Sequence, residues 1–136
     1  MYDNKIALIV RADLQTWQKL NVAAFLASSI AVKYPETHGK SFVNSSGSTY
    51  LPFIKHPILI YGADDNAQLD RAFQRAKDRD LSIGIYTMPL FSTKNEEGNL
   101  QEIAAQTDET QDLVGIIIYG ENRKVDKAIS GLKFHL

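Results

Sequence analysis

IALIVRADLQTWQKLNVAAFLASSIAV, residues 6–32, is the stretch that decides the fold. It opens with five consecutive apolar residues, which predict a strand over Lys5–Val10 covered on both faces, because apolar and polar residues do not alternate there. A polar turn over residues 11–16 follows. Thr16 is then expected to cap a helix that runs to about Lys33. Since a loop between two buried elements is where binding and catalytic groups usually lie, this turn is the expected working surface.

The expected helix carries apolar residues at the spacing of one helical face. These residues are Leu20, Ala23, Ala24, Ala27, Ile30 and Ala31. Because most of them are small, they should let the helix lie close to a sheet. Pro35 should end the helix at Tyr34, since the residue before a proline avoids the helical region.

Three further buried strands are expected, at Pro57–Tyr61, Ser82–Thr87 and Leu113–Tyr119. Gly62 and Gly120 would turn the chain after two of them. The closing residues 132–136 are expected to pack back on the sheet.

Two more helices are expected, over Asn66–Arg79 and from Asn122 to about Ser130. Asp64 or Asp65 would cap the first, Asn122 would cap the second, and Gly131 would end it. The connections 35–56 and 88–112 are long for a folded domain, which suggests function or mobility. A short helix over Asn99–Gln106 is expected within the second connection.

Strands that alternate with helices predict an α/β fold whose sheet is covered on both faces. The 136 residues correspond to one domain, 1–136. The chain has no cysteine, and His38, His56 and His135 are scattered, so neither a metal site nor a cofactor is expected. Glycine-rich phosphate loops are absent from the sequence as well.

The charge pattern disfavours nucleic acid as a partner. The net charge is −1, and residues 96–112 hold six acidic groups and no basic one, which would repel a phosphate backbone. The start MYDNK does not match a secretory signal, and the apolar run Leu20–Val32 is too short to cross a bilayer. We therefore expect a cytoplasmic protein that does not bind a membrane.

Two segments resemble the type II peptidyl-tRNA hydrolase family. They are IVRADLQTWQKLNVAAFLAS, residues 9–28, and KVDKAISGLKFHL, residues 124–136. The whole chain most resembles an uncharacterised family, the domain of unknown function numbered two thousand, which is considered to share the hydrolase fold. The resemblance implies a three-layer α/β/α sandwich around a mixed four-stranded sheet.

The resemblance also implies where a site would lie. Arg11, Asp13 and Lys19 would line the loop after the first strand, and Tyr86 and Thr87 would end the third strand. The sequence departs from the hydrolase pattern at three places. The loop QTWQKLN has a single lysine where the hydrolase loop is rich in glycine and lysine, Ser28 stands where the hydrolase has a helix histidine, and no carboxylate follows the third strand. These departures suggest that hydrolase activity has been lost and that tRNA is not a ligand.

The candidate catalytic pair is Lys19 and Asp13. A cation in the first turn of a helix opposes the helix dipole, which suggests a role in contacting an anion or a carbonyl oxygen. Each residue has a plain alternative, because Lys19 can extend into water, Asp13 can cap its own turn, and Arg11 can form a structural ion pair. Candidate ligand-binding residues complete the set: Arg11, Trp17, Asn21, Ser28, Tyr86 and Thr87.

Three functions remain open on the sequence. The first is a binding or regulatory domain that takes an unknown small molecule between the loop 11–19 and the segment 88–112. The second is a hydrolase of an ester or amide that uses Lys19 and Asp13. The third is a structural homodimer or higher homo-oligomer formed through the apolar run Tyr50–Ile54, although Tyr50, Phe53 and His56 would instead be a lid or plain cover over the site.

Overall fold

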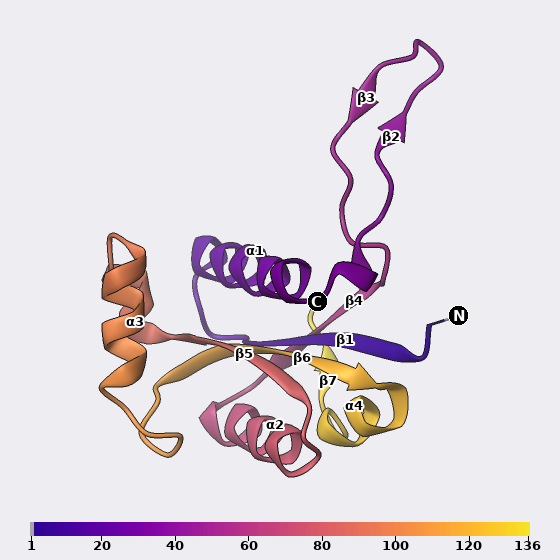
Figure 1. Cartoon of the computed structure of the whole chain (residues 1–136). Helices are drawn as coiled ribbons and strands as arrows, with labels where there is room; N and C mark the ends of the chain where they lie inside the picture. Colours follow the sequence, from indigo (N-terminus) through magenta and orange to yellow (C-terminus); the bar gives the residue numbers. More distant parts are fainter. Residues whose placement is uncertain (1) are drawn as a thin grey trace.

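Five strands form the main sheet of the computed structural model, which describes residues 2–136 (Figure 1). In sheet order they are β5 (Ser82–Thr87), β6 (Leu113–Glu121), β1 (Asn4–Arg11), β4 (Ile58–Ala63) and β7 (Lys133–Phe134). β1 is parallel to β4 and antiparallel to β6, so the sheet is mixed, as expected. The expected number of four strands is wrong, because the C-terminal tail packs back on the sheet and adds β7 beside β4.

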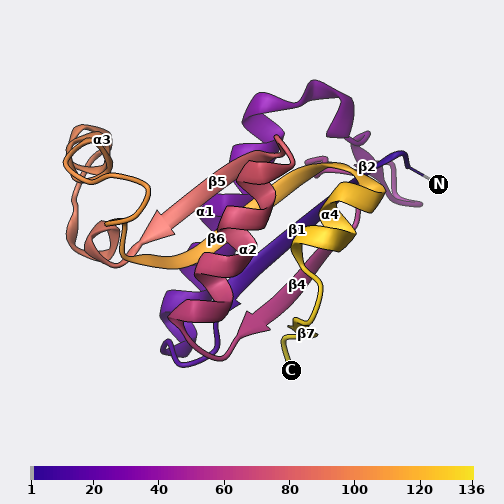
Figure 2. The same cartoon turned by 90° about the horizontal axis from the view of Figure 1, so that it is seen from below.

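Helices cover both faces of this sheet. α1 (Thr16–Lys33) lies on one face, and α2 (Asn66–Asp78) and α4 (Asn122–Ala128) lie on the other (Figures 1 and 2). α3 (Glu96–Ala104) lies beyond one end of the sheet. Among the helices of residues 2–136, none combines the length and apolarity that a membrane span requires.

β1 explains why the opening apolar run shows no alternation. Ile6, Leu8 and Val10 pack in the core beneath α1. Ala7 and Ile9 point the other way, into the core beneath α2 and α4. A strand buried on both faces needs apolar residues at every position.

The buried face of α1 agrees with the expected one at Ile30 but differs elsewhere. Val22, Leu26 and Ile30 are buried, whereas Leu20 is 66% exposed and Ala24 is also exposed. The helix is apolar nearly all round, so the sequence alone did not select the face. The contact with β6 does, since Val22 packs against Gly115, where a Cβ would come within 2.5 Å of the Val22 Cγ1.

Two expected helix caps are wrong by one residue. Gln15, not Thr16, precedes α1, and its backbone N–H donates to Gln18 Oε1 at 3.0 Å. Glu121, not Asn122, caps α4 and accepts from the Lys124 N–H at 3.1 Å, because β6 runs directly into that helix. Asp65 caps α2 by accepting from the Gln68 N–H at 2.9 Å, which settles the choice between Asp64 and Asp65.

The expected turns at Gly62 and Gly120 are also wrong, because both glycines lie inside strands. Gly120 leaves room for Leu81, whose Cδ2 lies 2.4 Å from where a Cβ would stand. Arg11 likewise belongs to β1, where it pairs with Ala63.

The first long connection forms a projecting hairpin, here called the arm and defined as residues 39–54 (Figure 1). Its strands are β2 (Phe42–Val43) and β3 (Thr49–Tyr50), and they are antiparallel. At the tip, the Asn44 side chain accepts from the N–H groups of Ser46 and Ser48 at 3.0 and 3.1 Å. The 3₁₀ turn Pro35–Thr37 leads from α1 into the arm.

The second long connection contains a 3₁₀ turn, Met88–Ser92, followed by α3. α3 begins three residues earlier than the expected start at Asn99. Asn95 caps it by accepting from the Gly98 N–H at 2.8 Å. Ahead of α3, Phe91 brings the segment against the first turn of α1, with its ring centroid 5.5 Å from that of Trp17.

Candidate functional site

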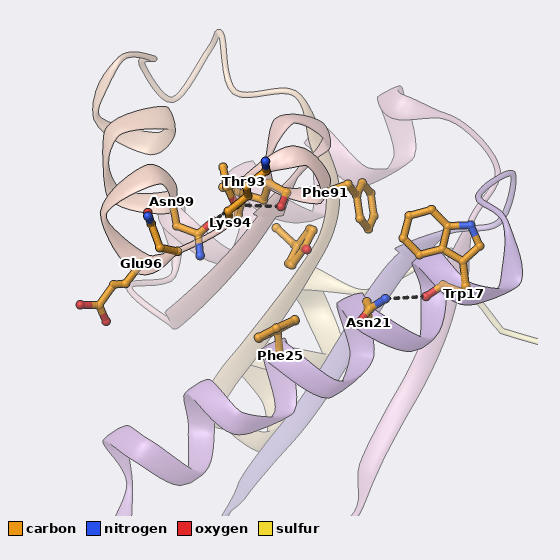
Figure 3. Close-up of a pocket in the computed structure, with 11 residues that line it drawn as sticks. Trp17, Asn21, Phe25, Phe91, Thr93, Lys94, Glu96 and Asn99 are labelled. Carbon is orange, nitrogen blue, oxygen red and sulfur yellow. Dashed lines mark hydrogen bonds between the residues drawn. The ribbon is translucent and has the colours of Figure 1, made fainter.

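A groove of about 620 Å³ lies between the first half of α1 and residues 88–99 (Figure 3). Its volume falls within the range of small-molecule sites, roughly 300–1,000 Å³. α1 and β5 supply one side of the groove, and the 3₁₀ turn with the start of α3 supplies the other. The lining residues are Trp17, Asn21, Phe25, Tyr86, Leu90, Phe91, Thr93, Lys94, Asn95, Glu96 and Asn99.

Four aromatic rings form a continuous wall in this groove. Phe91 lies at the centre, with its ring centroid 5.5 Å from Trp17 and 5.0 Å from Tyr86. The Tyr86 ring is 6.1 Å from that of Phe25. Trp17 and Phe25 are 50% and 58% exposed, so these rings are not part of the core.

Neighbouring groups hold this wall in place. The Trp17 indole N–H donates to Gln15 Oε1 at 2.8 Å, which orients the ring at the start of α1. Tyr86 is the next-to-last residue of β5 and is mostly buried, and burial raises the pKa of its phenol. The exposed aromatic surface is therefore preformed rather than dependent on a ligand.

Polar groups surround the aromatic wall. The Asn21 amide N–H donates to the Trp17 carbonyl at 3.1 Å, and its Oδ1 accepts no hydrogen bond from the described residues. The Thr93 hydroxyl is within hydrogen-bond distance of Asn99 Oδ1 and of the Leu90 carbonyl. Lys94 is the cation among the lining residues, and Figure 3 shows the Glu96 carboxylate directed away from the rings.

The structure separates the candidate catalytic pair from this groove. Asp13 accepts two hydrogen bonds from Arg11, at 3.0 and 2.9 Å, as an ion pair on the turn. This hydrogen bonding lowers the pKa of Asp13, and the Lys19 charge adds a smaller effect in the same direction. No hydrogen bond or ion pair joins Lys19 to Asp13 in the described part of the chain, and neither residue lines the groove.

The remaining candidate residues divide between the groove and other places. Trp17, Asn21 and Tyr86 line it. Thr87 is buried in the core, and Ser28 faces a different hollow, with its hydroxyl donating to the Phe25 carbonyl at 2.6 Å. The arm does not form a lid, because it projects from the end of α1 opposite to α3 (Figure 1).

Phe25, Phe91 and Lys94 are lining residues that the sequence alone did not single out. The useful signal was the apolar cluster MPLF at the head of the otherwise polar segment 88–112. Within residues 2–136, no three histidine, aspartate or glutamate side chains gather as a group that could hold a metal ion.

One comparison with known proteins gives a family, and none names an activity. The profile of a family described as "Protein of unknown function (DUF2000)" matches residues 4–136. A solved structure of a protein of unknown function from Agrobacterium tumefaciens strain C58 is similar over 100% of both chains, with 34% sequence identity and a TM-score of 0.95. The search among curated proteins found no match. Neither description mentions a peptidyl-tRNA hydrolase, so the expected hydrolase-like fold is not confirmed.

Proposed function

Because the chain belongs to the DUF2000 family of proteins of unknown function, we propose a function from the groove itself: it binds a small aromatic molecule that carries an acidic group. The observation that carries this proposal is the row of partly exposed aromatic rings in a preformed groove. Soluble proteins seldom leave such clusters uncovered unless they bind something.

The polar groups suggest which end of the ligand carries the charge. Lys94 can pair with a carboxylate or a phosphate, and Asn21 offers a free amide oxygen to a donor on the ligand. Glu96 does not oppose an anion at the rings, because its carboxylate points outward (Figure 3). The flat apolar part of the ligand would stack on Phe91 and Trp17.

The hydrolase alternative has less support from the geometry. Arg11 occupies both oxygens of Asp13, so this carboxylate is not free to activate a water. Lys19 also lies outside the groove in which a substrate would be held.

Proton–nitrogen NMR tests the proposal, since Trp17 is the single tryptophan and its indole N–H gives one signal. Naphthoate should shift this signal saturably, and the neutral naphthalenemethanol should bind more weakly. Phe91→Ala should weaken binding of both about 3- to 10-fold, as expected for one lost aromatic contact of roughly 0.5–1.5 kcal/mol.

Lys94→Gln should remove the preference for the acid and leave binding of the alcohol unchanged. Phe134→Ala is the control, because this aromatic residue lies on β7, outside the groove. If the Trp17 signal does not shift, or if Phe91→Ala shifts it as the wild type does, the proposal is wrong.

A further inference from the structure

The arm exposes an unusual amount of apolar surface. Phe42, Val43, Tyr50, Leu51 and Phe53 are between 47% and 86% exposed. Given that a fully buried aromatic side chain covers ~150–250 Å², these five residues present on the order of 600 Å². Isolated patches of this size are uncommon on monomers.

The arm is hydrogen-bonded at its base, and Lys40 beside that base is its one charged residue. No charged residue occurs from Ser41 to Ile54. At its base, the Gly39 N–H donates to the Phe53 carbonyl at 3.0 Å, and His38 pairs with Ile54. A two-stranded hairpin on its own is marginally stable in water, so this arm needs a surface to pack against.

A second apolar surface lies beside the arm. A hollow of about 580 Å³ separates the arm from α1, and Ala27, Ala31, Pro52 and Phe53 contribute to its lining. The adjoining outer face of α1 exposes Leu20, Ala24 and Val32. No charged residue interrupts α1 between Lys19 and Lys33.

We propose that a second copy of this chain covers both surfaces, forming a twofold dimer in which each arm lies on the partner's arm and α1 face. The two surfaces match in chemistry, since both are apolar and no charged residue occurs in residues 41–54 or 20–32. They also lie side by side on one chain, which is the arrangement that a self-complementary twofold contact requires. A nucleic acid would find no counter-charge for its phosphates within residues 41–54 or 20–32.

The exposed apolar area of the arm is large enough for a stable contact between two copies of the chain. If the two arms cover only each other, the contact buries on the order of 1,200 Å² in total, which is the lower limit for stable specific interfaces. Contact with the α1 faces adds to this value. The proposal is independent of ligand binding, because Leu20, Ala24 and Val32 do not line the groove.

Light scattering after size-exclusion chromatography tests the proposal with the full chain at micromolar concentration. The wild type should have twice the 15.2 kDa mass of one chain. Leu51→Asp should weaken the dimer about tenfold or more, because an unpaired carboxylate would be buried at the contact. Ala24→Asp should act in the same direction from the α1 face.

Leu100→Asp is the matched control, because Leu100 is also an exposed leucine but lies on α3. It should remain dimeric, and circular dichroism should show that every variant is folded. A monomeric wild type would overturn the proposal. A dimer that persists in both Leu51→Asp and Ala24→Asp would overturn it as well.

Discussion

Gly115 controls how closely α1 approaches the middle of the sheet. A Cβ at this position would lie 2.5 Å from Val22 Cγ1 and 3.3 Å from the Ile9 carbonyl oxygen. Gly115→Ala should therefore lower the free energy of unfolding by about 1–3 kcal/mol, the usual cost of overpacking. Urea denaturation measures this loss.

Gly62→Ala provides the control, since Gly62 is also a strand glycine but its Cβ would meet ordinary contacts at 3.6 Å or more. Its unfolding free energy should stay within about 0.5 kcal/mol of the wild type. Equal losses of unfolding free energy in Gly115→Ala and Gly62→Ala would show that close packing at Gly115 does not cause the loss.

His56 should make stability depend on pH. Its ring stacks on Tyr2 with centroids 4.1 Å apart, and its buried Nδ1 has no partner in the described residues. Burial, followed by the nearby Lys55 charge, lowers the pKa of His56 below its usual 6.5, while Glu36 opposes the shift. In acid, His56 therefore binds a proton more readily in the unfolded chain than in the folded one. The free energy of unfolding decreases as the pH falls below the pKa that His56 has in the unfolded chain.

Unfolding free energies measured by urea at about pH 8 and about pH 5.5, on either side of the unfolded histidine pKa, should show this difference. It should shrink in His56→Phe, which cannot take up a proton. His38→Phe serves as the control, because His38 is exposed. A pH dependence that is unchanged in His56→Phe would contradict the assignment.

At the scale of elements, α1 shows that a sequence can predict a helix without predicting which face of it is buried. Leu26 is buried and Leu20 is 66% exposed, although both fit an apolar stripe. Measured on the monomer, at protein concentrations below those at which two copies associate, Leu26→Ala should lower the unfolding free energy by about 2–5 kcal/mol. Leu20→Ala should change it by less than about 0.5 kcal/mol. Similar losses from the two substitutions would mean that α1 buries another face.

The short strands escaped prediction for a different reason. β2, β3 and β7 each contain two residues, which is too short for any periodicity in the sequence. β7 forms only because β4 offers it an edge, and Tyr61 stacks on Phe134 with ring centroids 4.8 Å apart. Such strands depend on tertiary contacts rather than on local preference.

At the scale of the whole molecule, the sequence predicted the α/β class and the helices that cover the sheet. It also placed three residues of the groove, Trp17, Asn21 and Tyr86, next to strand and helix ends. Phe25 and Phe91 could not be placed in the groove, because both line it only once Met88–Ser92 is folded against α1. The groove is therefore a tertiary property of segments far apart in the chain.

The two cores contain no arm residue except Ile54 at its base, so the sheet and its helices should fold without the arm. Replacing residues 42–51 with two glycines tests this, since the hydrogen bond from Gly39 to Phe53 shows that the cut ends lie close together. The shortened chain should unfold cooperatively, with a Tm that does not change with protein concentration. The Tm of the wild type should rise with concentration, because dissociation accompanies the unfolding of a dimer. A shortened chain that fails to fold would show that the arm is needed for the core, and a concentration-dependent Tm in that chain would place the dimer contact elsewhere.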